Sequence, residues 1–168
     1  PKPISTALVS VYVDGMAEFT AEASSLTFSF KAACNAAKNG SRELVETWLA
    51  SQQGDVNTKS EVKGSTLLSW ACFGGQVSIA DWLIQEKGAD KDAVENNGWT
   101  IFHNACISGT TEMVQYLVDQ QGFDPCSSMK DHEGYTPLRL AVKYGRGEVA
   151  NFLLSRRAGA GEGQAAAA

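Results

Sequence analysis

Cys106 and His103 are the two residues of this sequence whose types and spacing come closest to a catalytic pair. They lie three residues apart, which would place a thiol and an imidazole on one face of a helix. An imidazole next to a cysteine can activate the thiolate as a nucleophile. The position of Cys106 is nevertheless expected to face a stack of helices, where a buried thiol is inert. We therefore predict that the chain has no catalytic residues and no enzymatic activity.

Metal and phosphate chemistry also lack a matching pattern. The four cysteines contain no CxxC spacing, and with only two histidines a zinc site is not expected. The Gly74-Gly75 pair lacks the Lys and Ser/Thr of a phosphate-binding loop, so we interpret it as a helix end. We predict no metal and no cofactor. Cysteines without a metal or disulfide pattern favour an intracellular, reducing compartment, the cytoplasm first, although import into an organelle stays open.

The composition of the chain argues against some classes of partner. Of the 168 residues, 43% are hydrophobic and 20% are charged, which is typical of a globular domain. The net charge of −5 argues against nucleic acid, because phosphate binding needs a basic face. A run of about 18 apolar residues, which membrane insertion would need, does not occur. We interpret the basic residues near the end as a solvated surface; they are Arg139, Lys143, Arg146, Arg156 and Arg157.

Three segments of the chain repeat one pattern, and their periodicity says how the elements are arranged. Segments 64–90, 98–124 and 134–160 open with a glycine, at intervals of 34 and 36 residues. A period of this length indicates a solenoid of stacked units. The shared positions are Gly64, Gly98 and Gly134; Thr66, Thr100 and Thr136; Ala71, Ala105 and Ala141; Gly75, Gly109 and Gly145; and Leu83, Leu117 and Leu153.

Each shared position has a structural role within one unit. The opening glycine permits a turn conformation that a Cβ would disfavour. The threonine is placed to cap a first helix, and Pro137 fits the first helical turn, where no N–H is needed. The alanine lets a neighbouring helix approach, and the second glycine ends the first helix. An apolar-periodic second helix follows, so each unit is predicted to be a turn and two helices.

This pattern resembles the ankyrin repeat, a β-turn followed by two antiparallel helices. The resemblance covers about residues 28–160 and implies an all-α repeat solenoid of β-turn plus helix-turn-helix units. It also implies that the His103 ring hydrogen-bonds backbone in neighbouring turns. Two positions depart from the family pattern: Leu67 and Ile101 replace proline, and Ser69 and Arg139 replace histidine. The matching residues are Thr136-Pro137-Leu138, Ala141 and Gly145; Thr100, His103, Ala105 and Gly109; and Gly88-Ala89-Asp90.

The domain prediction divides the chain into an N-terminal arm, 1–25, a repeat domain, 26–160, and a flexible tail, 161–168. The repeats are expected at about 26–61, 62–95, 96–131 and 132–160. The first is a degenerate capping repeat, because no Gly-x-Thr opens it. Residues 7–13 favour a short N-terminal β arm, which either pairs with a partner's sheet edge or packs back on this chain or is disordered. Because the sequence starts at Pro1, we expect a fragment or a processed product.

The resemblance implies a concave binding surface, lined by the β-turn fingers and by one face of each first helix. Large apolar groups at places that core packing does not demand mark binding surfaces, and Trp and Tyr are favoured anchors. The alternative is that the finger aromatics stack on one another and stiffen the turns. The predicted protein-binding residues are Phe73, Trp99, Ile107, Tyr135, Lys143 and Tyr144. Among the other tryptophans, we assign Trp48 to the core and leave Trp70 and Trp82 open.

Together these features predict a non-catalytic protein–protein interaction module, or an accessory or scaffold subunit of a larger complex. Its partner would be another protein or a multi-subunit complex, and its oligomeric state stays open. One alternative is an inhibitor that occludes a partner enzyme or transcription factor. Another is the regulatory ankyrin domain of a longer enzyme whose catalytic part lies outside this sequence.

Overall fold

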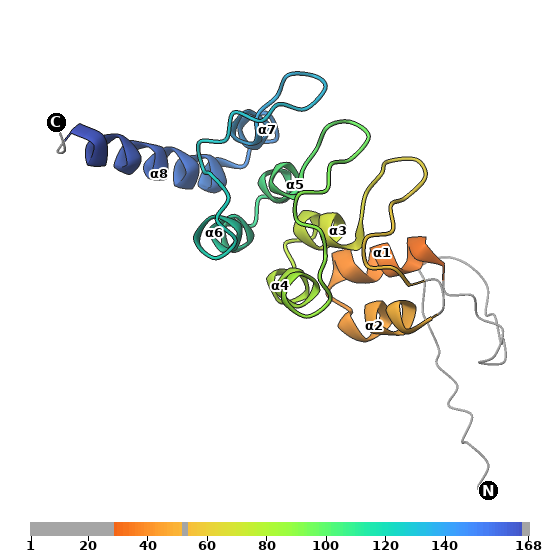
Figure 1. Ribbon diagram of the computed structural model, residues 1–168. Coiled ribbons are helices and arrows are strands. Elements are labelled where there is room, and N and C mark those ends of the chain that lie inside the picture. The colour runs from red at the N-terminus through yellow and green to blue at the C-terminus, as the bar shows by residue number, and fades with distance from the viewer. Residues whose placement is uncertain (1–28, 52–53, 166–168) are drawn as a thin grey trace, which may run out of the picture.

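The computed structural model describes residues 29–51 and 54–165, and within them the chain forms eight α-helices and no strand (Figure 1). The prediction of an all-α repeat solenoid is confirmed. The proposed β arm lies in residues outside the described ranges. The helices form four consecutive pairs: α1 (Phe30–Asn39) and α2 (Arg42–Ala50), α3 (Leu67–Phe73) and α4 (Val77–Gln85), α5 (Ile101–Ser108) and α6 (Thr111–Asp119), and α7 (Pro137–Lys143) and α8 (Gly147–Ala165).

The helix pairs stack into two layers. The first helices, α1, α3, α5 and α7, pack side by side in that order, and α4, α6 and α8 follow one another in the second layer. Three loops project from the same side of the first layer in Figure 1. We call them fingers 1, 2 and 3, and they comprise residues 58–66, 92–100 and 128–136. The surface formed by the fingers and the first helices is called the inner face below.

The repeated threonines and glycines set the ends of the first helices. The side chains of Thr66, Thr100 and Thr136 each accept a hydrogen bond from the backbone N–H three residues later. Each satisfies a donor that the first helical turn leaves unpaired. Gly109, which follows α5, has a φ of 83°, a left-handed conformation that costs glycine no Cβ clash. The predicted capping and helix-ending roles are thus present in the structure.

Small side chains hold the first helices close together. Ala71, Ala105 and Ala141 are fully buried between neighbouring first helices, as are Cys72 and Cys106, which follow two of them. Without bulky groups at these positions, the helices can pack at a short interaxial distance. Trp48 of α2 is also buried, in contact with Phe30, as its assignment to the core predicted.

Backbone hydrogen bonds join successive fingers. The Asn96 N–H donates to the Lys63 carbonyl at 2.9 Å, and the Asn96 side chain donates to the Val62 carbonyl at 3.1 Å. At the next boundary, the His132 N–H donates to the Asn97 carbonyl at 3.0 Å. These bonds fix the spacing between fingers, so the side chains that the fingers carry are held in place relative to one another.

The last helix differs from its sequence-based prediction. We expected the second helix of the last repeat over Val149–Leu154 and a flexible tail at 161–168, but α8 runs from Gly147 to Ala165. Helical structure therefore extends into the segment that we expected to be a flexible tail. Extending an existing helix is easier than nucleating one, which favours this continuation even though residues 158–165 contain three glycines, which disfavour a helix, beside three alanines, which favour it.

Candidate functional site

A cleft of about 540 Å³ opens on the inner face, between the first helices and fingers 1 and 2. Its walls come from three successive repeats. It therefore exists only because the repeats are stacked, and no single repeat contains it. The residues that line it are Lys38, Val62, Lys63, Ser65, Ser69, Trp70, Phe73, Glu95, Asn96, Asn97, Trp99 and Asn104.

Three aromatic side chains, Trp70, Phe73 and Trp99, form the apolar part of this cleft, and all three are partly exposed. Trp70 and Phe73 lie on α3 with ring centroids 5.9 Å apart in an edge-to-face arrangement, which is a favourable geometry for aromatic pairs. Trp99 comes from finger 2, and its indole Nε1–H donates to Asp131 of finger 3 at 3.0 Å. The orientation of the Trp99 ring is thus set by the next finger.

Asp131 is the buried carboxylate that organises finger 3. Besides the Trp99 indole, it accepts backbone N–H bonds from Glu133 at 3.0 Å and from Tyr135 at 2.7 Å. Desolvation raises its pKa, but the hydrogen bonds from Tyr135, Trp99 and Glu133 outweigh it, and the pKa lies below its usual value. Asp131 is therefore ionised at neutral pH and holds both aromatic residues of fingers 2 and 3.

Two lysines stand at the edge of the cleft. The Lys38 ammonium lies 5.2 Å from the centroid of the Phe73 ring, and the Lys63 ammonium lies 5.5 Å from that of Trp70. These distances are within the range of cation–π attraction. Within the described residues, neither lysine forms an ion pair. Each ammonium thus lies over a ring, and no carboxylate of the described residues neutralises it.

Polar side chains lie at the buried end of the cleft. Glu95 is only 9% exposed and accepts a hydrogen bond at 2.9 Å from the side-chain amide of Asn104, which is also buried. Ser69 is buried as well and closes a capping box with Thr66, since each side chain accepts from the other residue's backbone N–H. The buried end is thus satisfied by the protein's own hydrogen bonds.

A second group of exposed side chains surrounds Tyr135 on finger 3. The Lys143 ammonium lies 4.0 Å from the Tyr135 ring centroid, and the Arg139 guanidinium lies 5.3 Å from it. Lys143 also lies 3.5 Å from the Glu133 carboxylate and 6.0 Å from the Tyr144 ring. Three of the predicted binding residues, Tyr135, Lys143 and Tyr144, thus lie together, in a group separate from the cleft that holds Phe73 and Trp99.

Ile107 does not belong to either group, which corrects the expectation that it is exposed. It holds the same repeat position as Phe73 and Lys143, but only 5% of it is exposed. Arg146 reaches back from the next repeat and donates through Nε to the Ile107 carbonyl at 2.7 Å. Ile107 is therefore covered by the neighbouring repeat and presents no surface to a partner.

His103 and Cys106 lie in buried environments that suit a structural role. His103 is fully buried, and its Nδ1 lies 3.2 Å from the Thr100 backbone N–H and 3.0 Å from the Thr100 hydroxyl. Burial lowers the pKa of His103, so the ring is neutral at pH 7. Burial also raises the pKa of the Cys106 thiol to about 12, so no thiolate nucleophile is available.

Metal binding and membrane insertion can also be judged from the described residues. No group of three or more His, Cys, Asp or Glu side chains there is arranged to hold a metal ion. None of the helices in the same ranges combines the length and hydropathy needed to cross a membrane.

Sequence reasoning missed part of the cleft. Trp70 carries no assignment from the sequence, although it lies three residues before Phe73 and helical spacing puts both on one face. Glu95 and Asn104 were not identified, because a single acid and a single amide carry no recognisable pattern. Their proximity depends on how finger 2 folds against α5.

Comparison with known proteins gives one positive result. The family model described as ankyrin repeats in three copies matches overlapping segments at residues 16–95, 33–127 and 75–162. Among curated proteins, none matches the chain.

Proposed function

The chain belongs to the ankyrin-repeat family, and on this basis we propose that it binds another protein through its inner face, as a non-catalytic interaction module or an accessory subunit of a larger complex. Ankyrin repeats are generally protein–protein interaction modules and are typically non-catalytic. The open question for this chain is which surface binds, and the inner face is the surface that we select.

The observation that carries the proposal is the cleft with Trp70, Phe73 and Trp99 on its walls. Aromatic side chains in pockets supply most of the binding energy in many interfaces. Here the edge-to-face contact of Trp70 with Phe73, and the bond from Trp99 to Asp131, hold the rings before any partner arrives. A site that is already ordered loses less conformational entropy on binding.

The Tyr135 group supports the same face as a second point of contact. Tyr135, Tyr144 and Lys143 are all at least partly exposed and lie one repeat beyond the cleft. A partner that covered both groups would span fingers 1 to 3. This arrangement fits the extended surfaces with which solenoid proteins bind their partners.

The test is a quantitative capture experiment with extract from cells that naturally express the protein. Immobilised wild type is compared with Trp99→Ala/Tyr135→Ala and, separately, with Phe73→Ser, and captured proteins are measured by mass spectrometry. We expect one protein or complex to be captured by wild type and lost from both variants. Circular dichroism establishes that each variant is folded, and Phe73→Ser leaves the bond between Trp99 and Asp131 in place.

Leu154→Ala is the matched control, because Leu154 is an apolar residue of α8, 48% exposed, in the second helix layer. It should capture the same partner as wild type. If folded inner-face variants keep the partner, or if Leu154→Ala loses it, the inner face is not the binding surface.

A further inference from the structure

We propose that the cleft binds an acidic peptide segment of the partner, with one large apolar side chain among Trp70, Phe73 and Trp99 and with flanking carboxylates paired to Lys38 and Lys63. This inference rests on the proposed function, since it names the chemistry of the segment that the inner face takes. It follows from the shape of the cleft, from the charge at its edge and from the polar groups at its buried end.

The apolar part of the cleft fits a single side chain better than a flat surface. The volume of the whole cleft, about 540 Å³, is in the range of pockets that hold small ligands, so it has room for one large side chain and for the peptide residues on either side of it. Its rings are fixed on two sides, by the contact between Trp70 and Phe73 and by the bond from the Trp99 indole to Asp131. A leucine or phenylalanine side chain inserted there would be desolvated against three ring surfaces.

The charge at the edge of the cleft is opposite to that of the whole protein. The chain carries a net charge of −5, yet Lys38 and Lys63 both line the cleft without an ion pair in the described structure. Of the described lining residues, only Glu95 carries a carboxylate, and that carboxylate is buried and bonded to Asn104. A carboxylate that arrives at the edge therefore meets two ammonium groups and no exposed acid.

Two other ligand classes fit less well. Aromatic pockets bind cations. Here the Lys38 ammonium already lies over the Phe73 ring and the Lys63 ammonium lies over the Trp70 ring, and each would repel a second cation. Single-stranded nucleic acid pairs stacked bases with a track of cations. The cleft offers two lysines and a buried carboxylate on a net acidic protein, which is too little positive charge for that mode.

The experiment measures binding of three fluorescein-labelled peptide pools by fluorescence anisotropy. Each pool has a central Leu or Phe and carries Glu, Gln or Lys at the positions on either side. At about 50 mM NaCl, we expect the Glu pool to bind wild type about fivefold more tightly than the Gln pool, which corresponds to two exposed ion pairs. The advantage should shrink at about 300 mM NaCl, because salt screens exposed charges.

Matched variants separate charge from apolar contact. Lys38→Gln/Lys63→Gln should remove the preference for the Glu pool and leave the affinity for the Gln pool within about twofold of wild type. Lys31→Gln/Lys130→Gln makes the same change in net charge at exposed lysines outside the cleft and should keep the preference. Phe73→Ala should weaken binding of both pools, since it removes one wall of the apolar part.

Several outcomes would overturn the proposal. Equal binding of the Glu and Gln pools, or a preference for the Lys pool, would reject the acidic segment, and so would tighter binding of an oligo(dT) of about 12 nucleotides. Absence of binding by every pool up to about 1 mM would also reject it. Failure of the broader function is recognised separately, because it appears in the capture experiment as a partner that folded inner-face variants retain.

Discussion

Three thiols lie within the layer of first helices, and their position decides their chemistry. Cys34 of α1, Cys72 of α3 and Cys106 of α5 are buried, whereas Cys126, in the loop before finger 3, is exposed. Burial raises the pKa of Cys34 and Cys106 to about 12 and raises that of Cys72 as well. A thiol that stays protonated and shielded acts as a small apolar group in the core.

The four cysteines should therefore differ sharply in reactivity. In the native protein, we expect Ellman's reagent to modify Cys126 rapidly and the three buried thiols only as fast as the protein unfolds. The absorbance change should correspond to one thiol in buffer and to four in denaturant. Cys126→Ser is the control and should remove the fast phase. A fast phase that survives in this variant would contradict the buried placement of the other three.

His103 gives the folded protein a dependence on acid. Its pKa is lowered by burial, so below its ordinary pKa of about 6.5 the unfolded chain binds a proton that the native ring does not. Stability should then be fully present above about pH 6.5 and decrease as the pH falls below it, by less than about 1.4 kcal/mol per pH unit. Urea unfolding at a series of pH values between about 7.5 and 5.5 measures this slope.

Two variants isolate the contribution of His103 from that of the acidic residues. His103→Asn should reduce stability at pH 7.5 and show a shallower fall toward pH 5.5 than wild type. His132→Asn, at the exposed second histidine, is the matched control for replacing a histidine by asparagine. The same slope in His103→Asn as in wild type would mean that His103 is not the group that titrates.

At the scale of single elements, only features that depend on neighbouring residues could be predicted from the sequence. A cap at Thr100 and a left-handed residue at Gly109 depend on a few neighbouring backbone groups, so residue type and spacing were sufficient. The burial of Ile107 was not predictable, because it depends on Arg146 of the following repeat. The hydrogen bond from Trp99 to Asp131 was not predictable either, because it joins residues that lie 32 positions apart in the sequence.

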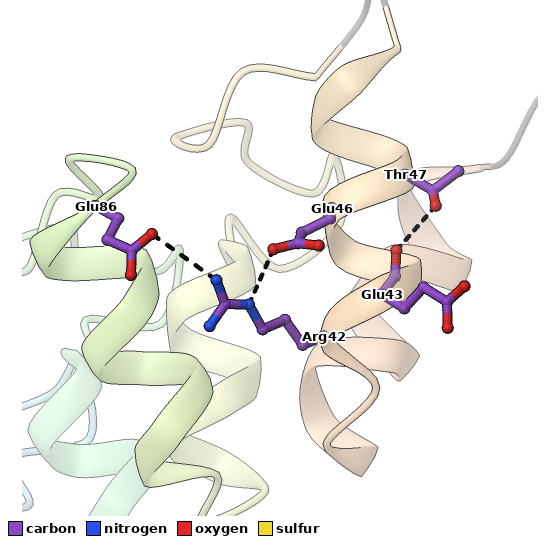
Figure 2. Close-up of polar contacts among 5 residues, drawn as sticks. All are labelled: Arg42, Glu43, Glu46, Thr47 and Glu86. Atoms are coloured by element: carbon purple, nitrogen blue, oxygen red, sulfur yellow. Dashed lines mark hydrogen bonds and ion pairs between the residues drawn. The ribbon is translucent and has the colours of Figure 1, made fainter.

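Contacts between the second helices of successive repeats also cannot be predicted from the spacing of the repeats. Arg42 of α2 lies between α2 and α4, with its Nε 2.9 Å from Glu46 and its guanidinium 3.8 Å from Glu86 and 4.6 Å from the centroid of the buried Trp82 ring. Figure 2 shows this side chain directed toward both carboxylates, while the Glu43 side chain points away from it. Arg42 therefore helps to join the first repeat to the second.

Replacing Arg42 should weaken that connection measurably but modestly. Because the Arg42 side chain is half-exposed, we expect Arg42→Gln to lower the free energy of unfolding by about 1 kcal/mol, mostly through Trp82 and Glu46, and by less in high salt. Glu43→Gln, one residue along, is the control and should cost about 0.3 kcal/mol through the helix dipole. Urea unfolding at two salt concentrations compares the variants. Equal effects of the two variants would show that Arg42 makes no specific contact.

At the scale of the whole molecule, each repeat is stabilised by its neighbours, and within the described residues the last repeat packs against one neighbouring repeat. Val142 of α7 occupies the repeat position of Cys72 in α3 and Cys106 in α5. Both cysteines are fully buried by the next repeat, but Val142 is 64% exposed. Repeat position alone therefore does not determine burial, since a covering neighbour is also required.

Equivalent substitutions at these positions should consequently have different effects. Cys106→Asn would bury an amide between α5 and α7 and should lower the free energy of unfolding by more than about 2 kcal/mol. Val142→Asn changes an exposed surface and should stay within about 0.5 kcal/mol of wild type. Chemical denaturation measures both. A large loss in Val142→Asn would mean that this end of the stack is covered in solution by a second copy of the chain. Sedimentation velocity on wild type and on Val142→Asn would then have to reveal a dimer that the substitution dissociates.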